Sequence, residues 1–327
     1  MNITKQSDSI TNSNIIRSSR LPRILNQQVI LVILMIVIAT AVTIVNSNFL
    51  SVKNLFNIIS AVSVIGIATI GASMVLIVGE FDLTLGAVVS IQTWIMALIT
   101  PIYGATLGIT AALFAGLVFG AFTGLVVSRV KASSFIVTLA LSSVYTGIGL
   151  LLNRGKYSSM SGIFTIFKEK IFGFIPYSIV ALFIILVIAA LVFKFTKFGR
   201  ILFSTGANQQ AAYLSGIKVK MYKVIVFAIA GVLYGIASVV LISQIGVAMN
   251  YIGEPYTLAA IAAAVLGGVV LGGGKGNVLG IFLGVLLFGL VNNAMILMNI
   301  KAYWRGIVIG AIILIALAIS GYAESKE

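Results

Sequence analysis

The feature that most constrains this chain is a succession of apolar runs, most of them long enough to cross a lipid bilayer. A membrane-spanning helix needs about 20 consecutive apolar residues. Sixty per cent of the chain is hydrophobic and 9% is charged, a composition that excludes a soluble globular domain. We therefore predict an all-α polytopic membrane protein with about ten transmembrane helices. The runs lie at roughly 29–47, 57–78, 84–100, 105–128, 133–152, 177–195, 222–245, 257–272, 277–298 and 303–321.

The run at 257–272 is short for a span, so eleven spans or a re-entrant segment are alternatives to ten. The run at 257–272 is also followed by a glycine-rich stretch, Leu271-Gly-Gly-Gly-Lys-Gly276. That stretch lacks the first glycine and the Ser or Thr of a nucleotide-binding P-loop, since position 269 is Val and position 276 is Gly. No ATPase site is expected there.

The distribution of basic residues predicts the orientation of the chain. The net charge is +14, but the basic residues lie between the apolar runs, which favours a role in topology over nucleic-acid binding. The stretch Lys194–Lys223 carries six positive charges and no negative one, so we place it in the cytosol. An even number of spans then puts both termini in the cytosol, with fourteen Lys and Arg residues inside and seven outside.

This orientation divides the chain into a membrane domain with short tails. We expect a cytosolic N-terminal tail at 1–28, a transmembrane domain at 29–321 and a cytosolic C-terminal tail at 322–327. Of the two largest polar connections, we expect 153–176 to be an external loop and 196–222 to be a cytosolic loop.

The residue types that are missing argue against an enzyme. The chain has no cysteine and no histidine, which removes thiol metal sites, disulfides and the commonest general base and metal ligand. We expect no catalytic residue, metal site or cofactor in this chain.

The cytosolic loop contains a short predicted helix. Asn208 is a favourable N-cap and Gly216 a favourable stop, which together frame about two turns. Positions 208, 211, 212 and 215 share one face at helical spacing, and they are Asn, Ala, Ala and Ser. A face of small residues lets another surface approach closely, although a basic loop that only sets topology is the alternative.

Two carboxylates interrupt the apolar sequence at Glu80 and Asp82. A carboxylate in hydrocarbon is costly, so both must face a polar cavity, a loop or another protein surface. Three interpretations are open: a proton or cation relay, a catalytic pair, or a structural hairpin in which Asp82 caps the next helix.

A few amides in the predicted spans are candidates for the wall of a transport path. They are Gln92, Asn292 and Asn293, whose side chains suit the hydroxyls of a neutral sugar, and Asp82 joins them as a possible path residue. Hydrogen bonding between helices is the alternative role. Stripes of small residues at Gly116, Gly120 and Gly124 and at Gly280 and Gly284 predict close helix packing.

The chain also contains a weak internal echo. Val75–Gly86 aligns with Val269–Gly280 without a gap, and the alignment pairs Gly79 with Gly273 and Gly86 with Gly280. Transporter folds often contain such repeats, so an internal repeat is possible.

Three motifs resemble the permease subunits of ribose-type ATP-binding-cassette importers. Gly206–Phe227, GANQQAAYLSGIKVKMYKVIVF, resembles the family's G-x-N-x-x-A-A-x-x-x-G-I-x-x-x-x-x-K segment. Val265–Gly276 matches V-L-G-G-x-x-x-x-G-G-K-G, and Gly79–Gly86 resembles a G-G-I-D-L-S-x-G hairpin in which Glu80 replaces the second glycine. The resemblance covers roughly residues 54–320.

The resemblance implies a multi-pass permease of a bacterial-type cytoplasmic membrane that imports a simple sugar or sugar-like metabolite. Its implied partners are cytosolic ATPase subunits that use ATP, a second permease subunit (identical or related) and an external substrate-binding protein. The residues it assigns to coupling with the ATPase are Gly206, Asn208, Ala211, Ala212, Ser215, Gly216 and Lys223. The alternative function is an ion-coupled secondary transporter that uses Glu80 and Asp82.

Overall fold

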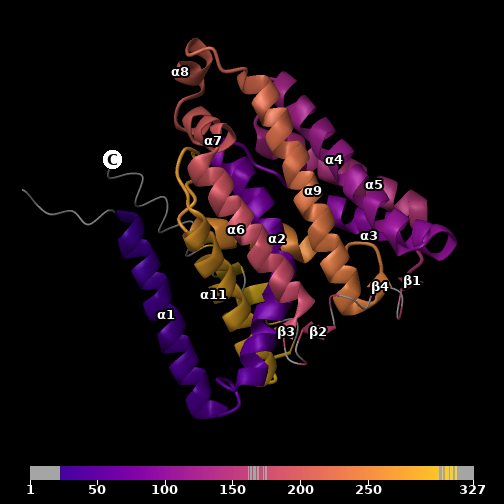
Figure 1. Cartoon of the computed structure of the whole chain (residues 1–327), viewed down its shortest axis with the longest axis vertical. Coiled ribbons are helices and arrows are strands. Elements are labelled where there is room, and N and C mark those ends of the chain that lie inside the picture. Colours follow the sequence, from indigo (N-terminus) through magenta and orange to yellow (C-terminus); the bar gives the residue numbers. More distant parts are fainter. Residues whose placement is uncertain are drawn as a thin grey trace, which may run out of the picture.

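The computed structural model places most of the chain in long helices (Figure 1). It describes residues 23–160, 162, 164, 167, 169–171, 173, 175–301, 304, 306–308, 310–311 and 314. Most of the predicted N-terminal tail, the C-terminal tail and most of the last apolar run, 303–321, lie outside the described residues.

Eight of the described helices are long and apolar enough to cross a membrane. They are α1 (Arg23–Val45), α2 (Val52–Ile77), α3 (Leu85–Tyr103), α4 (Ala105–Arg129), α5 (Ser134–Asn153), α6 (Tyr177–Phe195), α9 (Val219–Ile245) and α11 (Val278–Leu297). Each coincides with one of the predicted apolar runs, so the prediction of an all-α polytopic membrane protein is confirmed.

The other elements with defined bounds in the described part of the chain are short. Three further helices are α7 (Lys197–Ala207), α8 (Gln209–Leu214) and α10 (Glu254–Leu266). The four strands form two antiparallel pairs, in which β1 (Ser158–Ser159) pairs with β4 (Val247–Ala248) and β2 (Lys170–Ile171) pairs with β3 (Ile175–Pro176).

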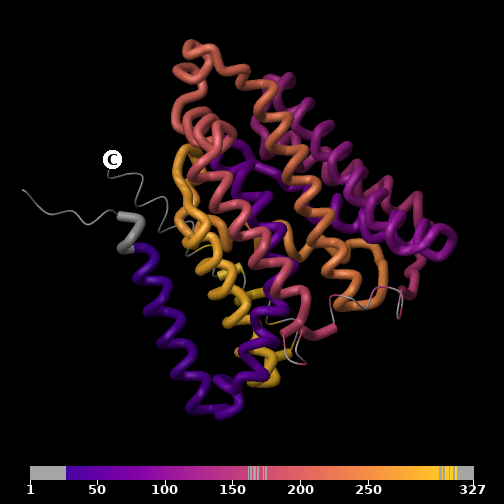
Figure 2. Tube along the Cα trace, viewed as in Figure 1, coloured from indigo at the N-terminus to yellow at the C-terminus, as the bar shows by residue number. Residues whose placement is uncertain are grey.

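Helices α2, α3 and α9 form the interior of the bundle, and α1 lies at its edge. In the most apolar stretch of each helix, 83% of α2 and 72% of α3 and α9 are buried, against 11% of α1. Figure 2 shows α1, in indigo, beside the rest of the bundle. Its second turn is held there by Gln27, which donates to the Leu266 carbonyl (3.1 Å), and by Gln28, which donates to Asn277 Oδ1 (2.8 Å).

Glycines bring α4 and α9 into backbone contact, as the small-residue stripe predicts. A Cβ atom added to Gly116 would lie 2.2 Å from the Gly231 carbonyl oxygen, and one added to Gly120 would lie 2.2 Å from that of Phe227. Because neither position has room for a side chain, the two helices touch along this seam. Gly284 packs in the same way against the Ala263 carbonyl, which joins α11 to α10.

The apolar run at 257–272 does not form a spanning helix. Helix α10 has 13 residues and ends at Leu266, which makes it about 20 Å long, against a hydrocarbon core of about 30 Å. Gly267 and Gly268 end it, and Gly268 has a left-handed backbone at φ +90°. Hydropathy recognises an apolar stretch but not a glycine stop inside it, so the apolar run extends beyond the end of the helix.

The two segments of the internal echo meet in the structure. Gly79 and Gly273 have nearly the same left-handed backbone, at φ +86° and +87°. A Cβ added to Gly273 would lie 2.9 Å from Gly79 Cα, and Gly274 N–H donates to the Ile77 carbonyl (2.8 Å). The likeness therefore holds at the two turns, while a repeat of the whole fold stays a prediction.

Candidate functional site

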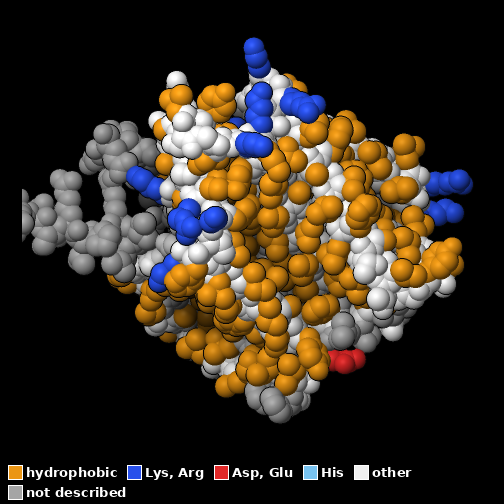
Figure 3. Space-filling model, turned by 45° about the horizontal axis from the view of Figure 1, so that its top comes forward, with side chains coloured by type: hydrophobic (Ala, Val, Ile, Leu, Met, Phe, Trp, Pro, Cys, Tyr) orange, Lys and Arg blue, Asp and Glu red, His pale blue; other side chains and the backbone are white. Residues whose placement is uncertain are grey.

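The polar segment between α6 and α9 forms one end of the molecule. Lys and Arg side chains gather there in Figure 3, over α7, α8 and the beginning of α9. The exposed basic residues of the segment are Lys194, Lys197, Arg200, Lys218 and Lys220. This concentration of positive charge is typical of the cytosolic side of a membrane protein.

Helix α8 begins and ends where its sequence predicts. Asn208 is its N-cap, and the Asn208 Oδ1 atom accepts a hydrogen bond from the Ala211 N–H (2.9 Å). Gly216 follows the helix with a left-handed φ of +83°, and its N–H donates to the Tyr213 carbonyl (2.9 Å). The short helix is thus fixed by its own termini.

The face that α8 exposes differs from the small-residue face in the sequence. Ala212 is only 5% exposed because it packs against its own chain. Tyr213 and Leu214 are 70% and 78% exposed, and Ala211 is also exposed. Ala211 can therefore meet a partner together with two large apolar side chains, whereas Ala212 cannot. Helical spacing identifies both faces but not which one turns inward.

Gly206 joins this basic segment to the helical bundle through backbone contacts. A Cβ added at this position would lie 1.7 Å from the Ile77 carbonyl oxygen, at the end of α2, and 2.4 Å from Gly274 N. The end of α7, the end of α2 and the glycine turn after α10 therefore meet at one point.

A charged cluster makes a second connection between the same parts. Lys223, near the start of α9, forms an ion pair with Glu80, and the two side chains are 12% and 11% exposed. Lys223 Nζ also donates to Gln209 Oε1 in α8 (2.9 Å). The turn after α2 is thus tied to both α8 and α9. The sequence gives no sign of this pair, because its members lie 143 positions apart.

Asp82 is buried in the segment between α2 and α3, where it is 4% exposed. Its carboxylate accepts hydrogen bonds from the Thr84 N–H (2.8 Å), the Thr84 hydroxyl (2.5 Å) and the Tyr234 hydroxyl of α9 (3.0 Å). Burial raises the pKa of the Asp82 carboxyl, and the hydrogen bonds oppose that rise. Asp82 supports the entry into α3, but its partner N–H is that of the N-cap residue, Thr84, rather than one inside the helix.

Two of the three candidate amides connect helices. Gln92 is fully buried, and its Nε2 atom donates to the carbonyls of Ala112 in α4 (3.1 Å) and Gly231 in α9 (3.0 Å). Asn293 exchanges two hydrogen bonds with Asn54 of α2 (2.9 and 3.0 Å). The buried Oδ1 atom of Asn292 has no hydrogen-bond partner in the described part of the chain, and the same holds for the Oε1 atom of Gln92.

Residues 54–317 match the family described as the permease component of the branched-chain amino acid transport system. The match covers most of the chain. The chain belongs to this permease family.

Curated relatives resemble the permease over nearly its whole length. The ribose import permease protein RbsC of Haemophilus influenzae is 33% identical over 304 residues, which cover 90% of this chain and 93% of that protein. The L-arabinose permease protein AraH of Azospirillum brasilense is 30% identical over 318 residues (93% and 90%). The autoinducer 2 import permease LsrC of Yersinia pestis is 28% identical over 281 residues (85% and 80%). No solved structure matches the chain.

Membership and fold together make the permease a multi-pass protein of a bacterial inner membrane and a transport component rather than a catalytic subunit. Within it, the residues that the sequence assigned to coupling form one connected region. Asn208 and Gly216 bound α8, while Gly206 and Lys223 attach it to the core. Glu80, Tyr213 and Leu214 complete this region, and the sequence did not assign them to it.

Proposed function

We propose that the permease is the membrane subunit of an ATP-binding-cassette importer and forms the path for a simple sugar or sugar-like metabolite. Membership of the permease family and similarity to relatives named for ribose, arabinose and autoinducer 2 import support this function. The structural observation that carries it is α8, a capped cytosolic helix that presents Tyr213 and Leu214 to solvent.

The proposed machine contains two permease subunits, identical or related, two ATPase subunits and an external binding protein. ATP is bound and hydrolysed by the ATPase subunits, and no cofactor is needed in this chain. The proposed topology keeps ten membrane segments with both termini in the cytosol, counting the eight long helices, the half-length α10 and the run at 303–321. Large exposed apolar side chains on a cytosolic helix favour a protein partner, since they gain by leaving water.

Movement of α8 would reach the membrane core by two routes. The first is the backbone contact of Gly206 with Ile77 and Gly274, and the second is the Lys223–Glu80 pair. Closure of the ATPase subunits would push α8 and shift the turns after α2 and α10, so that the path between the two permeases opens to the other side.

The alternative, an ion-coupled secondary transporter, would use Glu80 and Asp82 to carry protons or cations. Glu80 is paired with Lys223, and Asp82 accepts three hydrogen bonds. Both carboxylates thus have structural partners, which favours the importer over an ion relay.

The test is to co-express the permease with the ATPase and binding protein of its own system and to measure both assembly and uptake. Ala211→Arg and Tyr213→Arg should leave the permease in the membrane at normal yield but remove the ATPase on purification. Ala212→Arg should instead lower the yield of the permease, because Ala212 is buried in its own chain. Ser204→Arg places the same charge on the exposed surface of α7 and should retain the ATPase.

Uptake of labelled D-ribose or L-arabinose should require ATP hydrolysis and persist when the proton gradient is collapsed. Retention of the ATPase by the Tyr213→Arg variant, with normal uptake, would remove the docking role from α8. Uptake that survives inactivation of the ATPase would remove the importer function itself.

A further inference from the structure

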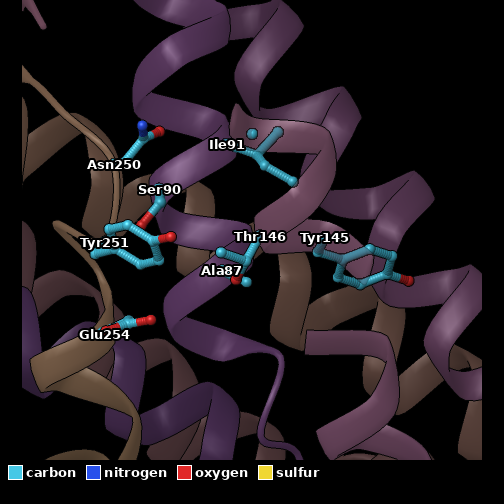
Figure 4. Close-up of a pocket in the computed structure, with 9 residues that line it drawn as sticks. Ala87, Ser90, Ile91, Tyr145, Thr146, Asn250, Tyr251 and Glu254 are labelled. Atoms are coloured by element: carbon cyan, nitrogen blue, oxygen red, sulfur yellow. The ribbon is translucent and has the colours of Figure 1, made fainter. Parts of the chain in front are cut away.

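A small pocket, lined by both apolar and polar side chains, opens beside the beginning of α10. It lies between α3, α5 and the loop that joins α9 to α10 (Figure 4). Figure 4 shows Tyr251 and Glu254 on one side of the pocket and Thr146 of α5 on the other, with Ser90 of α3 between them. The enclosed volume is about 10 Å³, which is room for one water molecule or one hydroxyl group.

The position of α10 sets the depth of this pocket in the membrane. The turn after α10 contacts Ile77, Gly79 and Gly206 at the cytosolic end of the molecule. At the other end of α10, Glu254 lines the pocket together with Ser90 of α3 and Thr146 of α5, both of which lie inside helices long enough to cross a membrane. Glu254 therefore lies within the thickness of the bilayer.

Glu254 is exposed at that depth, and in the described part of the chain it forms no ion pair. An unpaired carboxylate facing hydrocarbon would be costly. The side chain must then face water or another polar surface, which is what a transport path between two permease subunits supplies. Glu80 and Asp82 differ from it, because both are buried and have partners.

The loop that carries Tyr251 is held rigidly. Gly253 N–H donates to the Ser90 hydroxyl (3.0 Å), and Asn250 Nδ2 donates to Asn153 Oδ1 at the end of α5 (3.1 Å). Tyr251 has a left-handed backbone, φ +60°, which is unfavourable for a residue with a side chain. Its ring remains 46% exposed despite this. Such strain is kept only where the surroundings impose it, and it is common at functional sites.

We propose that this pocket is a sugar-contact site on the wall of the transport path. Glu254 accepts hydrogen bonds from hydroxyl groups of the passing sugar, the exposed ring of Tyr251 covers an apolar face of the sugar, and one hydroxyl enters the recess beside Ser90 and Thr146. A carboxylate beside an aromatic ring suits a neutral polyol, which offers both hydroxyl donors and C–H faces. The inference rests on the proposed function, since it names the substrate-facing residues of the same path.

The chain contains no cysteine, so a single Glu254→Cys substitution creates a unique probe of this wall. The importer, assembled with its ATPase and binding protein in vesicles, is treated with a membrane-impermeant sulfonated thiosulfonate reagent. The Glu254→Cys variant should react, and its labelling rate should change when ATP is hydrolysed. The control is Val187→Cys, on the 57%-exposed outer face of α6, which should not react because it faces lipid. Equal labelling of the two positions would overturn the proposal.

A second variant tests contact with the sugar. Glu254→Leu should lower kcat/KM of sugar uptake by about tenfold, the effect of losing a hydrogen bond to a charged acceptor. Glu254→Gln, which keeps one acceptor oxygen, should recover part of the loss. Labelled D-ribose and L-arabinose are the probes, and assembly with the ATPase is measured in parallel. A normal kcat/KM of sugar uptake in the Glu254→Leu variant would overturn the proposed sugar contact, even if position 254 is reached by water. Sugar uptake by the unaltered importer in the absence of ATP would instead refute the proposed function.

Discussion

Glu80 and Asp82, between α2 and α3, contrast with Glu254, at the beginning of α10. The first two carboxylates are almost fully buried, and each is used by its own chain: Glu80 pairs with Lys223, and Asp82 binds Thr84 and Tyr234. Glu254 is exposed at membrane depth without such a partner in the described residues. This difference shows that an acidic residue in an apolar sequence is not by itself a transport residue. The two kinds of carboxylate differ in whether the folded chain supplies a side-chain partner for the charge.

The largest expected effect on stability is at Asp82. Asp82→Ala leaves the Thr84 N–H, the Thr84 hydroxyl and the Tyr234 hydroxyl without their acceptor. Because buried donors without a partner are costly, the free energy of unfolding should fall by about 3 kcal/mol. Asp82→Asn keeps the shape and one acceptor oxygen and should lose less. Thermal unfolding of the detergent-solubilised permease measures both. An Asp82→Ala variant as stable as the unaltered chain would erase the contrast with Glu254.

The Glu80–Lys223 pair should have a smaller effect on stability and a clear one on coupling. It is neither fully buried nor exposed, so Glu80→Gln or Lys223→Gln should cost about 2 kcal/mol. Each should also raise the amount of ATP hydrolysed per sugar imported, since the pair ties the turn after α2 to α9 and, through Gln209, to α8.

The double exchange Glu80→Lys with Lys223→Glu restores the opposite charges and should recover most of the coupling. Lys220→Gln alters an exposed lysine one turn earlier and serves as the matched control. If Lys220→Gln and Lys223→Gln behave alike, the pair has no special role.

The same contrast exists between neighbouring amides. Asn293→Ala removes two hydrogen bonds to Asn54 and should destabilise the permease by about 1 kcal/mol, because hydrogen bonds between membrane helices contribute about 0.6 kcal/mol each. Asn292→Ala removes an oxygen that has no partner in the described chain, so the folded protein should be hardly affected. A double-mutant cycle of Asn54→Ala and Asn293→Ala should show a coupling energy, whereas a strictly additive result would contradict the pairing.

The smallest expected effect on stability is at Glu254. Its charge has no ion-pair partner in the described residues and interacts favourably only with the N-terminal end of the α10 dipole, so Glu254→Gln should lower the free energy of unfolding by about 0.5 kcal/mol. Unfolding measured beside Asp82→Asn provides the comparison, since both substitutions convert a carboxylate to an amide. A large destabilisation by Glu254→Gln would show that the residue is structural after all.

The sequence predicted features that depend on local chemistry and missed those that depend on long-range placement. Asn208 and Gly216 define α8 through their own side chain and backbone, and Gly116 and Gly120 predict a close helix contact because they lack side chains. The pairing of Glu80 with Lys223 needs two distant segments to meet, so no local pattern reveals it.

The exposed face of α8 and the depth of Glu254 were missed for a related reason. A short helix with small residues on one side and Tyr213 and Leu214 on the other can turn either side inward. The position of Glu254 follows only once the beginning of α10 is seen beside Ser90 of α3 and Thr146 of α5. Hydropathy had treated the run at 257–272 as one apolar segment, and the first turn of α10 was outside it.

Helix α9 connects the two ends of the permease directly. Its 27 residues span about 40 Å, from a start five residues beyond the end of α8 to the strand β4, which leads into the loop of Tyr251. The glycine seam with α4 and the two hydrogen bonds of Gln92 stiffen it along its length. We expect a helix braced in this way to tilt as a rigid body about the seam rather than to bend. A small displacement of the cytosolic end would therefore swing the opposite end, and with it the loop that carries Tyr251, in the reverse direction.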